Sequence, residues 1–473
     1  MYLRIVKTIY IFNPEHDLAL SNGDRHYIPP KNIREMAHDL AELMSATVAL
    51  HESTDERHSP LCPWGWDSAV VERFKKIDYP TLQLPSDESL NALRQYSERS
   101  TAHRFLSTFI QSHSNSTYTG ESLIIHTIEG IASYAERHRH ILLKAPLSSS
   151  GKGLRHVNEE GFNLPSSQRG STAESTATHQ RNLLQNPLEQ TKENYSSKIG
   201  KRADCNEIEQ SGGGMSALKK VENWANALIQ RHGYLTAEPY YDKVQDFAME
   251  FMVDAIGCRF IGYSLFVTDG HGRYTGSRLM SDAHIEDLLA TYVAREALHE
   301  IYRWTTAHYT DIIPKEWDVA QFPLYFGIDM MIVRKNQRPT SNIELDQEQR
   351  LITDSAERSN LNNVNRQQTE ESSDFPIANS QFKIHPCVEI NLRMNMGIIA
   401  HELYRHHMVP TAEGMFRIAR FPSNEALRRF HSEQSELHPA VFQDDRLAEG
   451  YLELTPITHE ALHLAYIHAQ KQD

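Results

Sequence analysis

The stretch His385-Pro-Cys-Val-Glu-Ile-Asn-Leu-Arg393 alternates polar and apolar side chains toward its end, a pattern typical of a β-strand with one buried face. On such a strand Glu389, Asn391 and Arg393 share one face, while the apolar residues between them share the other. A carboxylate, an amide oxygen and a guanidinium therefore line up beside a core. Because Mg²⁺ prefers a few oxygen ligands plus phosphate oxygens, this face is a candidate site for a metal and a phosphate.

A second apolar strand is predicted at 324–333, and Asp329 interrupts it. If the two strands pair, Asp329 meets Glu389 and Asn391, which would complete a set of metal ligands. The alternative is a polar outer face that holds only a cross-strand ion pair.

A loop rich in serine and glycine follows a predicted buried strand at 140–145, which carries Lys144. The loop residues are Ser149, Ser150, Gly151, Lys152 and Gly153. Exposed N–H groups and two lysines suit such a loop to hold phosphates. It is not a P-loop, because glycine and not serine or threonine follows the second lysine. The alternative is a flexible turn.

A hinge is predicted at Glu238-Pro-Tyr-Tyr-Asp242, between a helix at 217–232 and a strand at 246–253. Such a hinge can offer backbone groups to an adenine and a carboxylate to a ribose. An ordinary loop is the alternative. On the strand, Glu250 points away from the apolar face, so it is a candidate for the cleft, with a solvated position as the alternative. A hairpin is predicted at 258–279 and a long helix at 285–309.

In this order, the elements resemble the ATP-grasp superfamily over about residues 100–155 and 217–400. The resemblance implies ATP as cofactor, with Lys144 and the serine and glycine loop on the phosphates. It implies that Glu238 and Tyr241 meet the adenine and ribose. It also implies two Mg²⁺ ions, with Mn²⁺ as an alternative, on Asp329, Glu389 and Asn391. Arg393 would neutralise a transferring phosphoryl group or an acyl phosphate. The family's other ATP-binding lysine has no clear equivalent, and Arg104 is a weak candidate.

The fold class expected is α/β plus α+β, with an N-terminal pre-ATP-grasp unit ahead of a bipartite ATP-grasp domain. The chain also resembles ATP-grasp-like proteins with an N-terminal signature, here Asn13-Pro-Glu-His-Asp-Leu-Ala-Leu20, which suits either a substrate-side loop or a capped helix start. The expected units are 1–100 (α/β), 101–245 and 246–420 (the two ATP-grasp subdomains), and 421–473 (a helical tail).

Two segments, 156–216 and 335–380, are polar and are expected to be disordered insertions, because they hold few apolar residues to bury. They explain why only 40% of the 473 residues are hydrophobic. The net charge of −14 argues against an extended nucleic-acid surface. Four widely spaced cysteines and no apolar run long enough for a membrane favour a reducing, cytoplasmic compartment.

The function expected from the resemblance is an ATP-dependent ligase that activates a small-molecule carboxylate as an acyl phosphate for attack by an amine or thiol. One alternative is a nucleotide-binding regulatory or scaffold protein without turnover. A remote alternative is a zinc peptidase, because His459-Glu-Ala-Leu-His463 matches HExxH with Glu460 as the base. That motif lies near the end of the sequence without an evident third ligand, so an amphipathic surface helix is preferred there. The substrates and the oligomeric state do not follow from the sequence.

Overall fold

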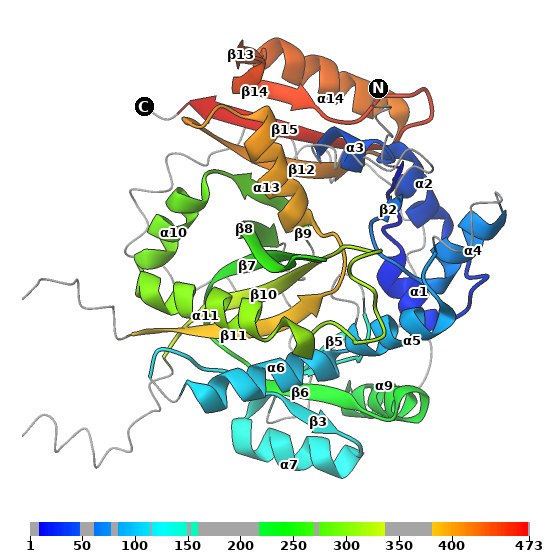
Figure 1. Ribbon diagram of the computed structural model, residues 1–473, viewed down its shortest axis with the longest axis vertical. Helices are drawn as coiled ribbons and strands as arrows, with labels where there is room; N and C mark the ends of the chain where they lie inside the picture. Colours follow the sequence, from blue (N-terminus) through cyan, green and yellow to red (C-terminus); the bar gives the residue numbers. More distant parts are fainter. Residues whose placement is uncertain are drawn as a thin grey trace, which may run out of the picture.

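The structure is a computed structural model that describes residues 9–47, 61–76, 84–113, 116–148, 153–158, 217–268, 274–335 and 381–471. The two polar insertions fall almost wholly outside these residues, as does most of the serine and glycine loop. Within them, Figure 1 shows two sheets packed on either side of helix α6 (Arg99–Ser112), with a small N-terminal unit beside both. The mixed α/β plus α+β organisation expected from the sequence is confirmed.

The N-terminal unit pairs two short parallel strands, β1 (Ile9–Ile11) and β2 (Leu61–Pro63). Its helices are α1 (His16–Asn22), α2 (Lys31–Asp39), α3 (Leu43–Thr47), α4 (Ser68–Lys76) and α5 (Asp87–Tyr96). Helix α1 ends at Gly23, whose φ of +77° is in the left-handed region that favours glycine. The signature at 13–20 therefore forms the connection from β1 into α1 and most of this helix.

The smaller sheet has the order β3-β6-β4-β5 in the described residues. Its strands are β3 (Leu123–Ile125), β4 (His140–Lys144), β5 (Leu154–Asn158) and β6 (Leu235–Pro239). Helices α7 (Ile128–His138) and α9 (Ala217–His232) cover one face with apolar side chains. The other face carries the polar residues of β4 and β6 and looks toward the larger sheet (Figure 1). Because β5 continues to Asn158, the first insertion begins slightly later than expected.

The larger sheet has the order β11-β10-β7-β8-β9-β12-β15-β14-β13, as far as the described residues go. Its bounds are β7 (Lys243–Asp254), β8 (Gly257–Thr268), β9 (Tyr274–Leu279), β10 (Leu324–Arg334), β11 (Phe382–Asn391), β12 (Ala412–Arg420), β13 (Val441–Gln443), β14 (Arg446–Glu453) and β15 (His463–Lys471). Its helices are α10 (Asp282–Ala290), α11 (Arg295–Ala307), α13 (Met396–His407) and α14 (Asn424–Leu437), with a short 3₁₀ helix η4 (Tyr309–Asp311). The single helix expected at 285–309 is wrong, because the chain turns between α10 and α11.

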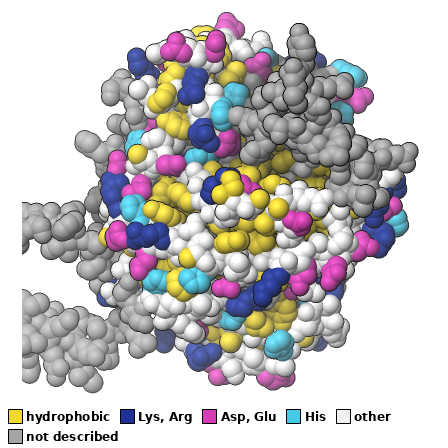
Figure 2. Space-filling view, in the orientation of Figure 1, with side chains coloured by type: hydrophobic (Ala, Val, Ile, Leu, Met, Phe, Trp, Pro, Cys, Tyr) yellow, Lys and Arg dark blue, Asp and Glu magenta, His cyan; other side chains and the backbone are white. Residues whose placement is uncertain are grey.

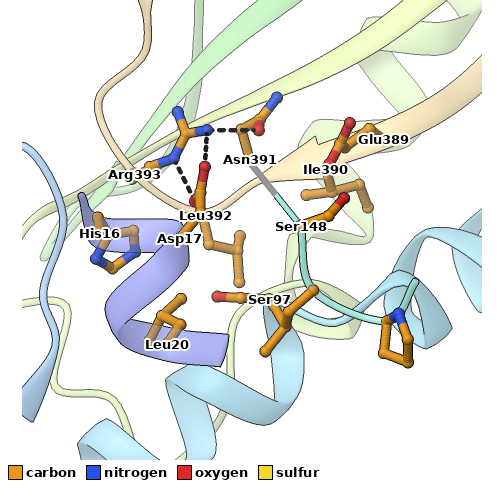
Figure 3. Close-up of a pocket in the computed structure, with 12 residues that line it drawn as sticks. His16, Asp17, Leu20, Ser97, Ser148, Glu389, Ile390, Asn391, Leu392 and Arg393 are labelled. Carbon is orange, nitrogen blue, oxygen red and sulfur yellow. Dashed lines mark hydrogen bonds and ion pairs between the residues drawn. The ribbon is translucent and has the colours of Figure 1, made fainter. Parts of the chain in front are cut away.

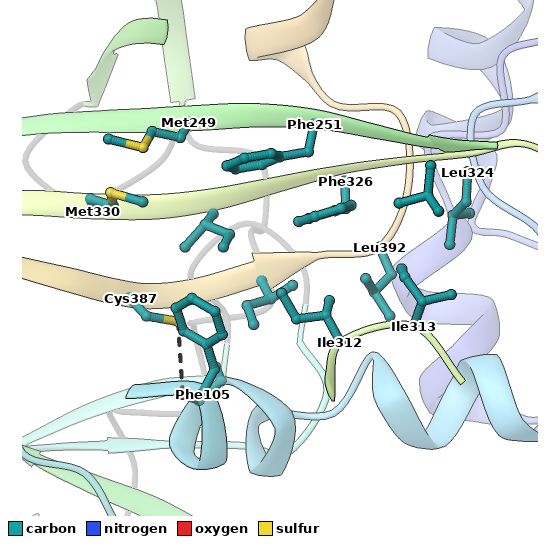
Figure 4. Close-up of a cluster of buried hydrophobic side chains, with 14 of the residues drawn as sticks. Phe105, Met249, Phe251, Ile312, Ile313, Leu324, Phe326, Met330, Cys387 and Leu392 are labelled. Carbon is teal, nitrogen blue, oxygen red and sulfur yellow. Dashed lines mark hydrogen bonds between the residues drawn. The ribbon is translucent and has the colours of Figure 1, made fainter. Parts of the chain in front are cut away.

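The largest apolar core among the described residues lies between the larger sheet and helices α6, α10 and α11. Figure 4 shows part of it, where Phe105 of α6 lies beneath the strands of the larger sheet. Phe251 on β7 and Phe326 on β10 are fully buried and stack with ring centroids 4.9 Å apart. Cys387 on β11 contributes its thiol, which faces the backbone oxygen of Ala102 on α6. Each large side chain buried in this way stabilises the fold by about 1.5–3 kcal/mol. The core therefore fixes β10 and β11, whose opposite faces carry the candidate site.

The helical tail expected at 421–473 is wrong, because this part of the chain forms α14 and three strands of the larger sheet. Strand β15 lies between β12 and β14 and is buried on both faces. Ala465 and Ile467 contact the core under α13, whereas Leu464 and Tyr466 contact the core under α14. A strand buried on both sides has a continuous apolar run rather than an alternating one, so its pattern resembles that of a buried helix.

The HExxH segment does not form a helix, and the zinc-peptidase reading fails on geometry. His459 and Glu460 lie in an exposed turn, whereas His463 is the first residue of β15. The ring of His463 is buried against Asp39 of α2, with 2.9 Å between Nδ1 and Oδ2. Two histidines on one helix face are required for a zinc site of this kind, and this chain does not place them there.

The surface in Figure 2 carries acidic, basic and histidine side chains interspersed over one face of the molecule. None of the described helices combines the length and the apolar character needed to cross a membrane.

Candidate functional site

A layer of buried polar side chains lies between the two sheets. Lys144 on β4 is 2% exposed, and its Nζ lies 2.5 Å from Oε2 of Glu238 on β6. The same Nζ donates to the backbone oxygen of Val388 on β11, at 3.3 Å. Thr236 is the cross-strand partner of Lys144, so its side chain shares this face of the smaller sheet. An ion pair this deeply buried needs its surroundings to offset the loss of water.

Several polar atoms of this layer have no hydrogen-bond partner within the part of the chain that the structure describes. They are Oγ1 of Thr236, which is 1% exposed, and both ring nitrogens of His385, which is fully buried on β11. Burial, with the charge of Lys144 nearby, lowers the pKa of His385 to about 3, so its ring is neutral and offers one donor and one acceptor. Leaving a buried polar group unpaired costs about 1–3 kcal/mol. A polar ligand between the sheets would satisfy these atoms, and ATP fits that requirement.

The predicted hinge lies at the edge of this layer. Glu238 ends in the ion pair with Lys144, and Tyr241 follows just beyond β6. The Tyr241 ring packs edge-on against His385 with centroids 5.1 Å apart, and its hydroxyl accepts a hydrogen bond from the backbone N–H of Glu121 at 2.8 Å. Burial raises the pKa of Tyr241, which keeps the phenol neutral. Glu238 therefore pairs with Lys144, and Tyr241 contacts His385 of the same layer, whereas the predicted contacts of both residues with adenine and ribose stay predictions.

The loop after β4 is described only at its two ends. Ser149, Ser150, Gly151 and Lys152 lie outside the described residues, and their predicted role in phosphate binding stays a prediction. Gly153 is described and buried, and its backbone oxygen accepts a hydrogen bond from Ala145 at 2.8 Å. A Cβ at position 153 would collide with the side chain of Ser148, which explains the glycine where the loop closes.

The predicted metal ligands come together on one face of the β10–β11 pair. Asp329 and Glu389 are direct cross-strand partners, and Nδ2 of Asn391 donates to Oδ2 of Asp329 at 3.3 Å. Burial and then the charge of Glu389 raise the pKa of Asp329 to about 7. A divalent cation would relieve that repulsion, so this donor set fits Mg²⁺ chemically. Among the described residues, no group of three or more His, Cys, Asp or Glu is placed to hold a metal, and this set includes an amide instead.

Replacing Asp329 by asparagine is expected to stabilise the metal-free protein at high pH. A carboxyl group whose pKa rises from 3.8 to about 7 on folding gives stability below pH 4 that is lost as pH rises through 7. Asp329→Asn removes that loss, so the variant should exceed the wild type by about 4 kcal/mol at pH 8 and match it near pH 4. Calorimetry in a chelating buffer at both pH values measures this. A variant less stable than the wild type at pH 8 would contradict the assignment.

Arg393 is held by a residue of the N-terminal unit. Its Nε and Nη2 donate to the two carboxylate oxygens of Asp17 on α1, at 2.9 and 2.8 Å, and Nη2 also donates to Oδ1 of Asn391 at 3.1 Å. Arg393, a predicted site residue, therefore lies beside the proposed metal ligands. The two N–H groups of its bidentate side are already bound to Asp17. Asp17 belongs to the signature at 13–20, but nothing in the sequence indicated its partner.

Arg99, at the start of α6, is the basic residue that sequence reasoning missed. Its Nη2 lies 3.0 Å from Oε1 of Glu389, and its Nε donates to the backbone oxygen of Ala145 at 3.1 Å. Arg99 is 8% exposed and joins the loop after β4 to the metal set. The weak candidate Arg104 instead stacks over Tyr96 and points away from Lys144 toward the chain near Asp311. A single arginine at a helix start has no sequence pattern to mark it.

Glu250 on β7 lies on the same sheet face as Asp329 but beneath α13. Its side chain is 1% exposed and accepts a hydrogen bond from Nδ2 of Asn395 at 2.7 Å. Burial raises the pKa of Glu250 to about 8, with a smaller contribution from Asp329. Gly327 and Gly397 leave room for the carboxyl group, since a Cβ at either position would overlap it. Its predicted contact with a cofactor stays a prediction.

A cavity opens beside these residues, between α1, the end of β11 and the loop after β4 (Figure 3). Asp17, Glu389 and Arg393 contribute its charged groups, and Ser97 and Ser148 contribute hydroxyls. The cavity thus adjoins the metal set on one side and the signature helix on the other.

No family model and no curated protein matches this sequence. Among solved structures, N5-carboxyaminoimidazole synthetase from Staphylococcus aureus complexed with ADP is 10% identical, with a TM-score of 0.40, over 98% of this chain and 87% of that one. Biotin carboxylase from Campylobacter jejuni, in a β-γ-ATP complex, is 10% identical with a TM-score of 0.41, over 87% and 71%. L-amino acid ligase from Bacillus licheniformis is 10% identical with a TM-score of 0.38, over 93% and 81%.

All three are ATP-grasp enzymes, the superfamily that the sequence resembles. Because every TM-score lies below 0.5, these likenesses say nothing about the reaction of this chain. A proposal for its function therefore rests on the residues of the site.

Proposed function

We propose that this protein is an ATP- and Mg²⁺-dependent ligase that activates a carboxylate as an acyl phosphate for attack by an amine or thiol. The observation that supports this best is the buried polar layer between the sheets. Lys144 and Glu238 form an ion pair there beside atoms of Thr236 and His385 that have no partner. The layer leads to the carboxylates of Asp329 and Glu389, so a nucleotide between the sheets would direct its phosphates toward them.

In this proposal Lys144, Lys152 and the N–H groups of the serine and glycine loop bind the phosphates. Glu238 and Tyr241 bind the adenine and ribose. Asp329, Glu389 and Asn391 would hold Mg²⁺, as two ions or with Mn²⁺ in their place, and the metal neutralises phosphate charge when it is bound.

The reaction proceeds in two steps. A carboxylate oxygen attacks the γ-phosphorus of ATP and ADP leaves. The neutral amine or the thiol then attacks the carbonyl carbon of the acyl phosphate, inorganic phosphate leaves with the C–O electron pair, and the proton lost by the nucleophile passes to the released phosphate. The chain mainly orients the partners and offsets their negative charge, with Arg393 next to the transferring group. Asp17 keeps that guanidinium fixed, so it needs no rearrangement as charge develops.

The proposed roles follow the units expected from the sequence. The two subdomains at 101–245 and 246–420 bind ATP between them, and the unit at 1–100 covers the substrate end. A cytoplasmic location is part of the proposal. Three cysteines are free among the described residues, at 62, 258 and 387, in keeping with a reducing compartment.

The experiment is a hydroxylamine trapping assay with the full chain. ATP, Mg²⁺ and a panel of small carboxylates are mixed with hydroxylamine, which converts an acyl phosphate to a hydroxamate. We expect one carboxylate class to release ADP and hydroxamate in equal amounts, and only with Mg²⁺. ADP release that no carboxylate stimulates, without hydroxamate, would contradict a ligase.

A non-catalytic nucleotide-binding protein is the second candidate, and one observation favours it. The two guanidiniums nearest to the metal set are already paired, Arg393 with Asp17 and Arg99 with Glu389. A site with its charges satisfied can bind a nucleotide without turning it over. ATP binding with no ADP release, for every carboxylate and amine tried, is the result that this candidate predicts.

A further inference from the structure

Apart from Asp17, which holds Arg393, the signature segment has no role in ATP activation as proposed above, yet it is firmly attached beside the cavity. Nδ2 of Asn13 donates to the backbone oxygen of Gly65 at 2.9 Å, and Nδ1 of His16 lies 3.2 Å from Oδ2 of Asp67. Both signature side chains are 1% exposed. The His16 ring also lies flat against Gly65, where a Cβ would collide with it. These contacts fasten the start of α1 to the connection between β2 and α4.

Asp17 lines the cavity together with His16 and Leu20 of the signature, and its carboxylate is ionised and oriented. Burial alone would raise the pKa of Asp17, but the charge and hydrogen bonds of Arg393 outweigh it and lower that pKa. Each carboxylate oxygen accepts one N–H from Arg393, so each keeps a further lone pair. The side chain is 23% exposed, against 16% for Arg393, so the carboxylate is the more accessible partner.

The part of the cavity wall around Asp17 offers mainly hydrogen-bond acceptors, whereas the hydroxyl of Ser148, which accepts from Nη2 of Arg99 at 3.4 Å, can supply a donor farther along the wall. Four of the five N–H groups of Arg393 already have acceptors, on Asp17, Asn391 and the backbone of Met394. The hydroxyl of Ser97 donates to the backbone oxygen of its helix at Leu93, which leaves its lone pairs free. A ligand complementary to this part of the cavity therefore carries several hydrogen-bond donors.

We propose that this cavity is the subsite of a small primary amine and that Asp17 binds its ammonium group. The inference rests on the proposed function and narrows the attacking nucleophile to an amine, which is bound as its ammonium and loses one proton to solvent before its nitrogen attacks. An ammonium group presents three strong N–H donors, whereas a thiol presents one weak donor. Leu20, Leu147 and Leu392 also line the cavity and suit a short hydrocarbon part of the amine. Glu389 lies on the same wall, next to the expected acyl phosphate.

The test compares probes that differ in one group, namely ethanolamine, 2-mercaptoethanol and ethylene glycol. Binding to the full chain is measured by ligand-observed NMR titration at pH 7.5 without nucleotide. We expect saturable binding of ethanolamine, and neither of the other two. Asp17→Asn should weaken ethanolamine binding at least tenfold, because the charge-assisted hydrogen bonds are lost. Asp24→Asn, at an exposed position just after α1, is the matched control and should bind as the wild type does.

A second variant covers the case in which Asp17→Asn fails to fold. Ser97→Ala keeps the ion pair between Asp17 and Arg393 and should weaken ethanolamine binding about threefold. Unchanged affinity in both variants would overturn the proposal, and so would thiol binding or no amine binding in the wild type. Separate ATP titrations of the wild type keep the outcomes distinct. Absence of ATP binding would refute the ligase, whereas ATP binding without amine binding would refute only this subsite.

Discussion

Lys144→Met is expected to lower the free energy of unfolding by about 3–5 kcal/mol and to abolish measurable ATP binding. Lys144 is 2% exposed, and its partner Glu238 is 6% exposed. Removing one partner of a buried ion pair leaves the other charge uncompensated, which is strongly destabilising. The same change removes the cation proposed to bind the phosphates. Scanning calorimetry measures the first effect, and titration calorimetry with ATP and Mg²⁺ measures the second.

The double variant Lys144→Met with Glu238→Gln separates the two effects. It removes both charges together, so much of the lost stability should return. ATP binding should not return, because the phosphate cation is still missing. If the single variant costs less than about 1 kcal/mol, the buried pair is not the structural feature described above. If the double variant binds ATP as the wild type does, Lys144 is not the phosphate lysine.

Glu389→Gln is expected to lower Mg²⁺-dependent ADP formation at least a hundredfold. Glutamine keeps the shape of the side chain and an oxygen that can accept a hydrogen bond from Arg99, so the fold should be little affected. It removes one of the negative charges proposed to hold Mg²⁺. The measurement is the initial rate of ADP release at increasing Mg²⁺, which should also need more metal for half-saturation.

Glu402→Gln is the matched control for that change. Glu402 lies on α13, is 14% exposed, and pairs with Arg405 and His406 away from the metal set. Its ADP release should equal that of the wild type. A Glu389→Gln rate within about threefold of the wild type would remove Glu389 from the metal site and weaken the proposal as a whole.

The strands that carry the site were predictable because their patterns are local. The alternation around Glu389 and Asn391, and the apolar run broken by Asp329, identified two strands whose pairing the structure confirms. Strand β15 was misread because both of its faces are buried, which removes the alternation that marks a strand. The hydrophobic pattern of a sequence identifies a strand with one buried face more readily than a strand with two buried faces.

The partners of the site residues were much less predictable. Asp17 lies 376 positions before Arg393, and Arg99 at the start of α6 meets Glu389 on β11 of the larger sheet. Such pairs depend on how complete units pack together, and no local spacing encodes them. The unpartnered nitrogens of His385 are likewise a property of the packed interior. The sequence pattern thus identified the strand residues of the site, whereas their partners Asp17 and Arg99 became apparent only in the structure.

The most direct test of the central claim is titration calorimetry of ATP into the full chain, with and without Mg²⁺. The proposed site predicts saturable binding of one ATP per chain with Mg²⁺. It predicts that this binding is greatly weakened by a chelator and by the double variant Asp329→Ala with Glu389→Ala. Binding that is absent with Mg²⁺, or that survives unchanged in the double variant, would contradict the assignment of an ATP and metal site to these strands.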